Sequence, residues 1–294
     1  MSPRVSVNSD PKAVPTLRSG RYSQSLERGL ALLECFSAER PELGIADMAH
    51  LSGMSRSTTH RYVITLVKLG YLEQVEGRKY RLGVRGGDLG MAALDCIELR
   101  RLAHPDLVEL RQRVSYTVSV AVLDRGQVMI MDWLRGFRGA TRLDLDLGPG
   151  SRLPLYCTSA GKVLLAHLSE KESKAIVNGL VLARRGRGPN AITQRHVLSR
   201  ELLQVRDAGL ALSEEELKRG ILSMAVPVHE SADAAVAAMD VTVPVAMISR
   251  ETLVGDLGPH LIAAAERVSA ALASAAGEVQ AETVQEASGG GSAL

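Results

Sequence analysis

The chain has 294 residues, of which 46% are hydrophobic and 23% charged, so it has the length of about two ordinary globular domains. No apolar run approaches about 18 residues and the N-terminus has no apolar core, so we expect neither a membrane span nor a signal peptide. The three cysteines are scattered, without a CxxC pair or zinc spacing, which favours a reducing cytoplasm and argues against a metal site.

The formal net charge of +2 does not by itself indicate a nucleic-acid partner, but the charge is unevenly distributed. Between Arg56 and Arg81 there are six basic residues and two acidic ones, a local net charge of +4. A concentrated basic stretch bears more on DNA binding than the total charge does.

The N-terminal part of the chain predicts an arm and a helix. Residues 1–21 are rich in Ser, Pro and Arg and predict a flexible basic arm. A helix is predicted to begin near Ser23, because apolar residues then recur at three- and four-residue steps. The residues expected to face the core are Leu26, Leu30, Leu33 and Phe36.

Two further helices joined by a tight turn are predicted next. A short helix over 45–51 leads into a turn over 52–54, where Gly53 is small enough for the two helices to cross closely. The second helix runs over 55–69 and ends at Gly70. Its predicted inward stripe comprises Tyr62, Leu66 and Leu69. Its opposite face comprises Thr58, Arg61, Thr65 and Lys68.

A basic hairpin follows, with strand-like runs over 71–75 and 79–82 around a turn over 76–78. Helix, turn, helix and hairpin together predict a winged helix-turn-helix domain over 22–83, which reads DNA through its second helix. The start of that helix offers N–H groups to phosphate, while hydroxyl and guanidinium groups suit phosphates and base edges. The predicted DNA-binding residues are Arg56, Ser57, Thr58, Thr59, Arg61, Arg78 and Lys79, with Arg81 beside them on the hairpin.

The remainder predicts a linker helix over 84–103, interrupted at His104-Pro105, and a larger domain over 104–275. Strands are predicted over 116–124, 127–133, 141–147, 223–229 and 236–243. Helices are predicted over 159–168, 193–208 and 258–275, with a capping box at Ser169 starting another. Residues 276–294 are rich in Ala, Glu, Gly and Ser and predict a disordered tail.

Catalytic motifs are incomplete. The order Ser-Ala-Gly-Lys over 159–162 fails as a phosphate-binding loop, because Tyr156 and Val163 stand where that loop needs Gly and Ser or Thr. A nucleophile elbow around Ser55 lacks its second glycine. We therefore predict no enzyme activity and no cofactor. Two alternatives stay open: an enzyme carrying a DNA-binding module, and an architectural DNA protein without a ligand.

These segments resemble the IclR family of bacterial transcription regulators, from about residue 22 to residue 273. The segments that carry the resemblance are SLERGLALLECF, LGIADMAHLSGMSRSTTHRYVITLVKLGYLE, GSRLPLYCTSAGKVLLA, GLALSEEELKRGILSMAVPV and AAVAAMDVTVPV. The resemblance implies an α+β fold, with a winged helix-turn-helix domain, a linker helix and a GAF-like effector domain built on a curved antiparallel sheet. It also implies a homodimer or tetramer, a double-stranded DNA operator, a small-molecule effector and no membrane partner.

The resemblance further implies an effector site. Its residues are Arg142, Leu145, Leu153, Ser159, Ala160, Ser213, Ile221, Ser223, Asp240 and Thr242. Residue chemistry supports part of this set, since Asp240 shares an apolar strand face and such a carboxylate needs a partner. Ser159 and Ala160 begin a helix, whose N–H groups suit a ligand carboxylate. Structural readings also stay open: a salt bridge or solvated strand end for Asp240, and a cap or small core residue for Ser159 and Ser223.

The ligand chemistry follows from two of these residues. Arg142 would pair with a carboxylate and Asp240 would accept a hydrogen bond from a hydroxyl, which together fit a hydroxylated aromatic acid. Residues 140–166 are similar to the branch of the family that regulates aromatic-acid breakdown through protocatechuate or 4-hydroxybenzoate. In a regular strand Arg142 and Leu145 lie on opposite faces, so either the strand carries a bulge or one of the two lies outside the site.

Overall fold

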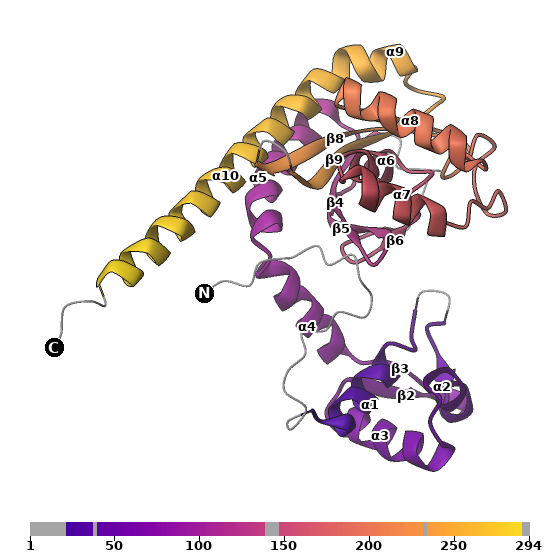
Figure 1. Cartoon of the computed structure of the whole chain (residues 1–294). Coiled ribbons are helices and arrows are strands. Elements are labelled where there is room, and N and C mark those ends of the chain that lie inside the picture. Colours follow the sequence, from indigo (N-terminus) through magenta and orange to yellow (C-terminus); the bar gives the residue numbers. More distant parts are fainter. Residues whose placement is uncertain (1–21, 38–39, 139–146, 232–233, 290–294) are drawn as a thin grey trace. The chain divides into compact units, whose positions relative to one another are not determined.

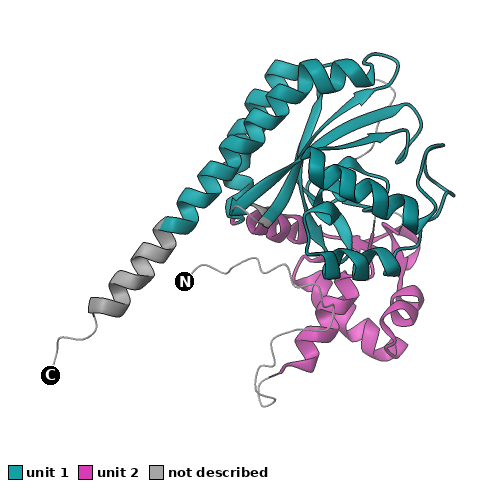
Figure 2. Cartoon of the chain, turned by 45° about the horizontal axis from the view of Figure 1, so that its top comes forward, with its two compact units in different colours: residues 1–11, 97–294 teal, residues 12–96 magenta. Residues whose placement is uncertain are grey.

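The computed structural model describes residues 22–37, 40–138, 147–231 and 234–289. The chain divides into two compact units, an N-terminal unit that ends at Cys96 and a C-terminal unit that begins at Ile97 (Figure 2). No helix in the described ranges combines the length and the apolar character that a membrane crossing requires.

The N-terminal unit is a helix-turn-helix with a small three-stranded sheet (Figure 1). Its elements are α1 (Gln24–Leu33), β1 (Leu43–Gly44), α2 (Ile45–Ser52), α3 (Arg56–Lys68), β2 (Leu72–Val75), η1 (Glu76–Arg78), β3 (Lys79–Leu82) and α4 (Val84–Asp95). The sheet has the antiparallel order β1-β3-β2. The predicted helices and hairpin are therefore confirmed.

Local chemistry explains these boundaries. Ser23 and Ser55 cap α1 and α3, each accepting a hydrogen bond from a backbone N–H in the first turn of its helix. Gly53 ends α2 with a φ of 68°, a left-handed conformation that glycine adopts without steric cost. The core between the helices and the sheet comprises Leu32, Phe36, Leu43, Met48, Val63, Leu66, Leu72 and Tyr80.

The predicted inward faces of α1 and α3 are partly wrong. Leu26 and Leu30 are exposed and Leu32 is fully buried, while on α3 Leu69 is exposed and Val63 is buried. Both helices carry apolar residues on more than one side, so their period identifies a helix without fixing which side meets the core. Packing selects the buried side: α1 packs against α2 and α3, and α3 also packs against β2.

The C-terminal unit is built on one antiparallel sheet of six strands, in the order β6-β5-β4-β9-β8-β7. The strands are β4 (Thr117–Asp124), β5 (Gln127–Leu134), β6 (Arg152–Leu153), β7 (Ala211–Glu214), β8 (Ile221–Ser231) and β9 (Ala234–Pro244). The helices are α5 (Glu98–Val114), α6 (Ser159–Ala166), α7 (Glu170–Gly179), α8 (Arg195–Ala208), α9 (Arg250–Thr252), η2 (Leu253–Leu257) and α10 (Gly258–Gly289). This curved sheet with helices confirms the predicted α+β class (Figure 1).

Helices cover both faces of the sheet. Helices α5 and α10 lie side by side against one face, and α6, backed by α8, packs against the other (Figure 1). Successive residues of a strand point to opposite faces, so β9 directs Ala238, Asp240 and Thr242 toward α6. The core on that side includes Ile130, Leu165 and Ala238. The sheet and α6 thus enclose the space in which a site can form.

The linker differs from its prediction. Pro105 lies inside α5, and the break falls between Asp95 and Glu98, at the boundary of the two units. Proline costs a helix one hydrogen bond, but α5 has a buried face that extends to both sides of Pro105, and that burial outweighs the cost. The buried residues are Ala103, Leu107, Leu110 and Val114.

Three further differences concern the ends and edges of the C-terminal unit. Helix α10 continues to Gly289, past residue 275, because a tail rich in Ala and Glu is also a sequence of strong helix formers. The edge strands β6 and β7 were not predicted, being short. The strand predicted over 141–147 falls almost wholly outside the described residues, which resume at residue 147.

Candidate functional site

The exposed face of α3 carries most of the predicted DNA-binding residues. Arg56, Ser57 and Arg61 are exposed and Thr58 is half-buried. The first turn of α3 holds no acidic residue, so nothing there offsets the positive end of the helix dipole. His60 and Ile64 are also exposed on this face, three and seven residues after Ser57. The sequence reasoning missed both, although this spacing was available to it.

The direct DNA contact predicted for Thr59 is wrong. Its side chain is fully buried, and its Oγ1 donates a hydrogen bond to the Ser55 carbonyl, 3.0 Å away. A threonine in a helix can satisfy its hydroxyl on the carbonyl of the preceding turn, which leaves its methyl group to pack in the core. Thr59 therefore supports α3 from inside.

The hairpin separates its basic residues into two kinds. Arg81 stands opposite Glu73 across the hairpin, and its Nε donates to Glu73 Oε2 at 3.0 Å, so its charge is compensated. Arg78 and Lys79 are exposed, and among the described residues no carboxylate pairs with either. Arg78 has a φ of 59°, which places it on the tight turn between the strands. The uncompensated charge of the hairpin thus sits at its tip.

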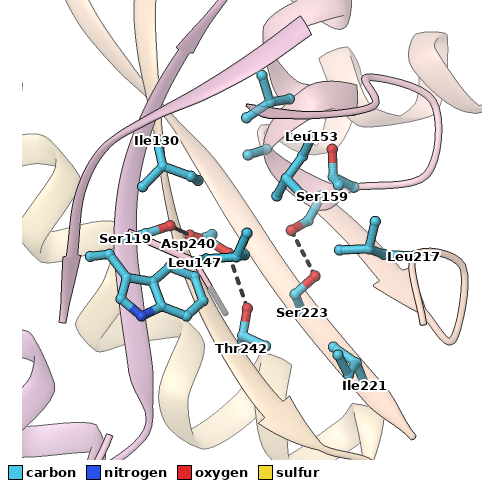
Figure 3. A pocket seen from close by; sticks show the side chains of 14 residues that line it. Ser119, Ile130, Leu147, Leu153, Ser159, Leu217, Ile221, Ser223, Asp240 and Thr242 are labelled. Atoms are coloured by element: carbon cyan, nitrogen blue, oxygen red, sulfur yellow. Dashed lines mark hydrogen bonds between the residues drawn. The ribbon is translucent and has the colours of Figure 1, made fainter. Parts of the chain in front are cut away.

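A cavity lies between the sheet and the start of α6 in the C-terminal unit (Figure 3). Its apolar lining comprises Val128, Ile130, Trp133, Leu147, Leu153, Ala160, Leu217 and Ile221. Its polar lining comprises Ser119, Thr158, Ser159, Ser223, Asp240 and Thr242. An apolar pocket with a few convergent polar groups is the usual form of a small-molecule site.

Seven of the ten predicted effector residues line this cavity: Leu153, Ser159, Ala160, Ile221, Ser223, Asp240 and Thr242. Ser213 does not line it; its buried Oγ donates to the Cys157 carbonyl, 3.1 Å away, and so ties β7 to the segment before α6. Arg142 and Leu145 lie outside the described residues. The sequence reasoning missed Ser119 and Trp133, which come from strands it had predicted but not connected with the site.

Polar groups inside the cavity form two short networks (Figure 3). Ser119 and Thr242 both donate hydrogen bonds to the Asp240 carboxylate, Thr242 over 3.1 Å. Ser119 and Asp240 are direct neighbours in the pairing of β4 with β9, so the sheet register brings them together. On the other wall Ser159 Oγ and Ser223 Oγ lie 2.9 Å apart, joining α6 to β8.

Asp240 is a buried carboxylate whose charge has no counterion among the described residues. Burial raises its pKa to about 6, while the hydrogen bonds from Ser119 and Thr242 act in the opposite direction. A carboxylate in this state is held in place by two donors and keeps further acceptor capacity. The salt-bridge reading of Asp240 therefore finds no support in the described ranges.

The start of α6 faces the same cavity. Thr158 caps it by accepting a hydrogen bond from the Gly161 N–H at 3.1 Å, and Ser159 and Ala160 occupy the first turn. A Cβ at Gly161 would lie 2.2 Å from the Leu155 carbonyl oxygen, so only glycine allows α6 to start this close to the preceding segment. The positive end of the helix dipole is thus fixed at the cavity wall.

A helix-turn-helix unit with an exposed basic face, joined to a unit with a mainly apolar cavity that holds a few polar groups, defines a ligand-responsive DNA-binding regulator. A family model for the IclR helix-turn-helix domain matches residues 25–76, and one for the bacterial transcriptional regulator IclR C-terminal region matches residues 91–270. The chain therefore belongs to the IclR family of bacterial transcription regulators. This family consists of regulators and not of enzymes.

Individual relatives agree with this assignment. The chain is 36% identical over 211 residues to the HTH-type transcriptional regulator XynR of Escherichia coli K12, covering 71% of this chain and 82% of the relative. It is 32% identical over 232 residues to the p-hydroxybenzoate hydroxylase transcriptional activator of Acinetobacter baylyi, covering 78% and 84%.

A solved structure is similar over most of the chain. It is an IclR homologue from Microbacterium hydrocarbonoxydans complexed with 4-hydroxybenzoate, 25% identical in sequence. The TM-score is 0.68, and the match covers 84% of this chain and 98% of the homologue. The similarity therefore includes both units, each with its own fold.

Proposed function

We propose that the cavity of the C-terminal unit binds a carboxylic or hydroxy-aromatic acid of a catabolic pathway, and that this effector controls how the N-terminal unit binds its operator. The observation that carries the proposal is the pairing of two polar walls across an apolar space. One wall is the Asp240 carboxylate held by Ser119 and Thr242, and the other is the start of α6 at Ser159.

The two walls differ in the ligand group that each one suits. The first turn of α6 offers N–H donors and a positive dipole end, which favour a carboxylate. Asp240 is itself an acceptor and would repel an anion, so it favours a donor such as a phenolic hydroxyl. The ring between these groups would contact Ile130, Trp133 and Leu153. Hydroxybenzoate in the Microbacterium homologue is a ligand of this kind.

On the DNA side, we propose that α3 enters the major groove of a double-stranded operator. Arg56 and Arg61 would reach base edges or phosphates, and Ser57 and Thr58 would contact the backbone near the helix start. Arg78 and Lys79 at the tip of the hairpin would contact the neighbouring backbone. Operator DNA also places the proposed activity in the cytoplasm.

Control would act by linkage between the two sites. An effector that binds one arrangement of a homodimer or tetramer more tightly shifts the population toward that arrangement, and with it the spacing of the two recognition helices. The connection between the units is the break between α4 and α5, after Asp95. Residues 84–103 would carry the change between the 22–83 and 104–275 domains.

Ligand titrations of purified protein test the effector proposal. Asp240→Ala is expected to weaken 4-hydroxybenzoate by about tenfold or more, since a hydrogen bond to a charged group contributes about 1.5–3 kcal/mol. Benzoate lacks the hydroxyl, so its affinity for Asp240→Ala should not be lower than its affinity for the unaltered protein. Ser213→Ala is the matched control, because this buried hydroxyl bonds to the Cys157 carbonyl and does not itself line the cavity. No affinity better than millimolar for any such acid would contradict the proposal.

A further inference from the structure

A charged cluster lies behind the cavity, centred on the buried Lys162 of α6. Its side chain is completely buried, and its Nζ lies 2.5 Å from Glu216 Oε1, 2.5 Å from Glu201 Oε1 and 2.8 Å from the Leu212 carbonyl oxygen. These three partners come from the loop before β8, from α8 and from β7. None of the four residues lines the cavity, so the cluster is not part of the proposed effector contacts.

Burying these charges costs free energy. Burial raises the pKa of Glu216 to about 7, with Lys162 acting in the opposite direction. A buried ion pair is often no more stabilising than well-packed apolar side chains of the same volume. Stability alone is therefore a weak reason for the cluster, and what it holds in place is the more informative question.

The cluster holds the segment that we call the β7–β8 loop, residues 215–220. Glu216 is followed by Leu217, whose side chain lines the cavity (Figure 3). Lys162 thus binds the loop at Glu216, the residue directly before Leu217 in the cavity wall. The link runs from Lys162 to the loop, and Ser159 lies three residues before Lys162 on the same side of α6.

Backbone contacts brace the same loop from its outer side. Gly188 N–H donates to the Glu216 carbonyl at 2.9 Å, and Asn190 N–H donates to the Glu215 carbonyl at 3.2 Å. A Cβ at Gly188 would lie 1.8 Å from the Glu215 carbonyl oxygen, so the two segments meet backbone to backbone. Within the loop, the Gly220 N–H donates to Glu215 Oε1 at 2.7 Å.

We propose that Lys162 and Glu216 are positioning residues, which fix the β7–β8 loop so that Leu217 closes the effector cavity and limits the size of the ligand that fits. The inference rests on the proposed function, that this cavity takes the effector. Because the ion pair ties the loop to α6, the wall made by Leu217 and the wall made by Ser159 keep a constant separation. The selectivity for ligand size then depends on the Lys162–Glu216 ion pair, although the ligand does not contact either residue.

Glu216→Gln tests the positioning with little change in shape. Lys162 keeps Glu201 and the Leu212 carbonyl as partners, so the variant leaves no buried ammonium without a counter-charge. Glu201→Gln is the matched control, since it removes the other carboxylate of Lys162 from α8 and not from the loop. Both variants are compared with the unaltered full-length chain.

Trp133 gives a readout that does not depend on any ligand. It is the single tryptophan of the chain, and its half-buried side chain lines the cavity, so a change in the quenching of its fluorescence by acrylamide reports a change in access at the cavity. Glu216→Gln is expected to increase this quenching, and Glu201→Gln is expected to leave it unchanged.

Ligand selectivity gives the second readout. The ratio of affinities for 4-hydroxybenzoate and for the larger 6-hydroxy-2-naphthoate should fall roughly tenfold in Glu216→Gln, the usual scale for a pocket contact. Leu217→Ala should lower this ratio as well, and adding Glu216→Gln to it should change little more, because both act on one wall.

Two results overturn the proposal: equal Trp133 quenching in Glu216→Gln and unaltered protein, or equal changes in Glu216→Gln and Glu201→Gln. If Glu216→Gln does not fold, Leu217→Ala decides, and an unchanged selectivity or quenching then contradicts the role of the loop. If neither acid binds any variant, the proposed function fails, while the quenching comparison still tests the positioning on its own.

Discussion

The two candidate sites are built in different ways. The DNA-binding face comes from one helix and one hairpin, within residues 56–79, and its side chains point outward from a small core. The polar groups of the cavity come from four segments, β4, α6, β8 and β9, which only the sheet order brings together. A site that reads a large polymer needs an exposed local surface, whereas a site that encloses a small molecule needs the whole fold around it.

Charge follows the same division. Arg56, Arg61 and Arg78 are solvated, so they attract phosphate at long range and lose that attraction in salt. Asp240 is buried, and the low dielectric around it raises its pKa and strengthens its few hydrogen bonds.

The first prediction concerns the enclosed charge. Folding raises the pKa of Asp240 from 3.8 to about 6, so its ionised form opposes folding above pH about 6. Asp240→Asn removes that charge, and should raise the free energy of unfolding at pH 8 by about 3 kcal/mol, from about 1.4 kcal/mol per pKa unit. The gain should shrink as the pH falls from about 7 to 4, because protonation then removes the same penalty in the unaltered protein.

Urea unfolding at several pH values measures this difference. Glu216 also titrates in this range, but it is present in both proteins and cancels in the comparison. Asp256→Asn, on an exposed carboxylate, serves as the control and should show no such gain. If Asp240→Asn is less stable than the unaltered protein at pH 8, or if its gain in stability does not depend on pH, the buried charge of Asp240 does not oppose folding.

The second prediction concerns the exposed helix face. Arg61→Ala should weaken operator binding by about 1–3 kcal/mol if the guanidinium reads a base. Arg81→Ala is the control, because Arg81 is an equally basic residue of the same unit whose charge is already paired with Glu73. Fluorescence anisotropy with a labelled operator gives both values. Equal losses in the two variants would mean that net charge, and not the α3 face, sets the affinity.

The third and smallest effect concerns the tip of the hairpin. Arg78→Asn should lower the slope of log affinity against log salt by about one unit, with little change in sequence preference. Asn is chosen over Ala because the φ of 59° at this position is one that Asn tolerates. A loss confined to one operator sequence would instead indicate base contact.

Much of the fold could be predicted because its signals are local. Ser23, Ser55 and Ser169 cap the helices that the sequence led us to expect, and the hairpin over 71–82 was visible from its pattern. Pro105 was wrongly predicted to interrupt the helix. The tertiary burial that stabilises α5 around this proline cannot be predicted from the neighbouring residues alone. The prediction of which side of α1 faces the core was wrong for the same reason.

The cavity could be predicted only in part. The resemblance supplied Ser159, Ser223 and Asp240, but nothing local distinguishes Ser119 from any other serine until β4 pairs with β9. Thr59 and Ser213 were placed in the two sites because a hydroxyl group counts as polar in a sequence, although each one satisfies its hydrogen bond inside the core. The sequence alone therefore does not predict which residues meet through the pairing of distant strands, or which hydroxyl groups form their hydrogen bonds inside the core.

The central claim is that the exposed α3 face and the enclosed cavity are coupled through one chain. The most direct test titrates the full-length protein onto a duplex from its own upstream region, at low ionic strength, with and without saturating 4-hydroxybenzoate. The account predicts specific binding whose affinity changes by about fivefold or more when the acid is present, the usual scale of such coupling. An affinity no better than that for unrelated duplex, or one that the acid leaves unchanged while it occupies the cavity, would contradict it.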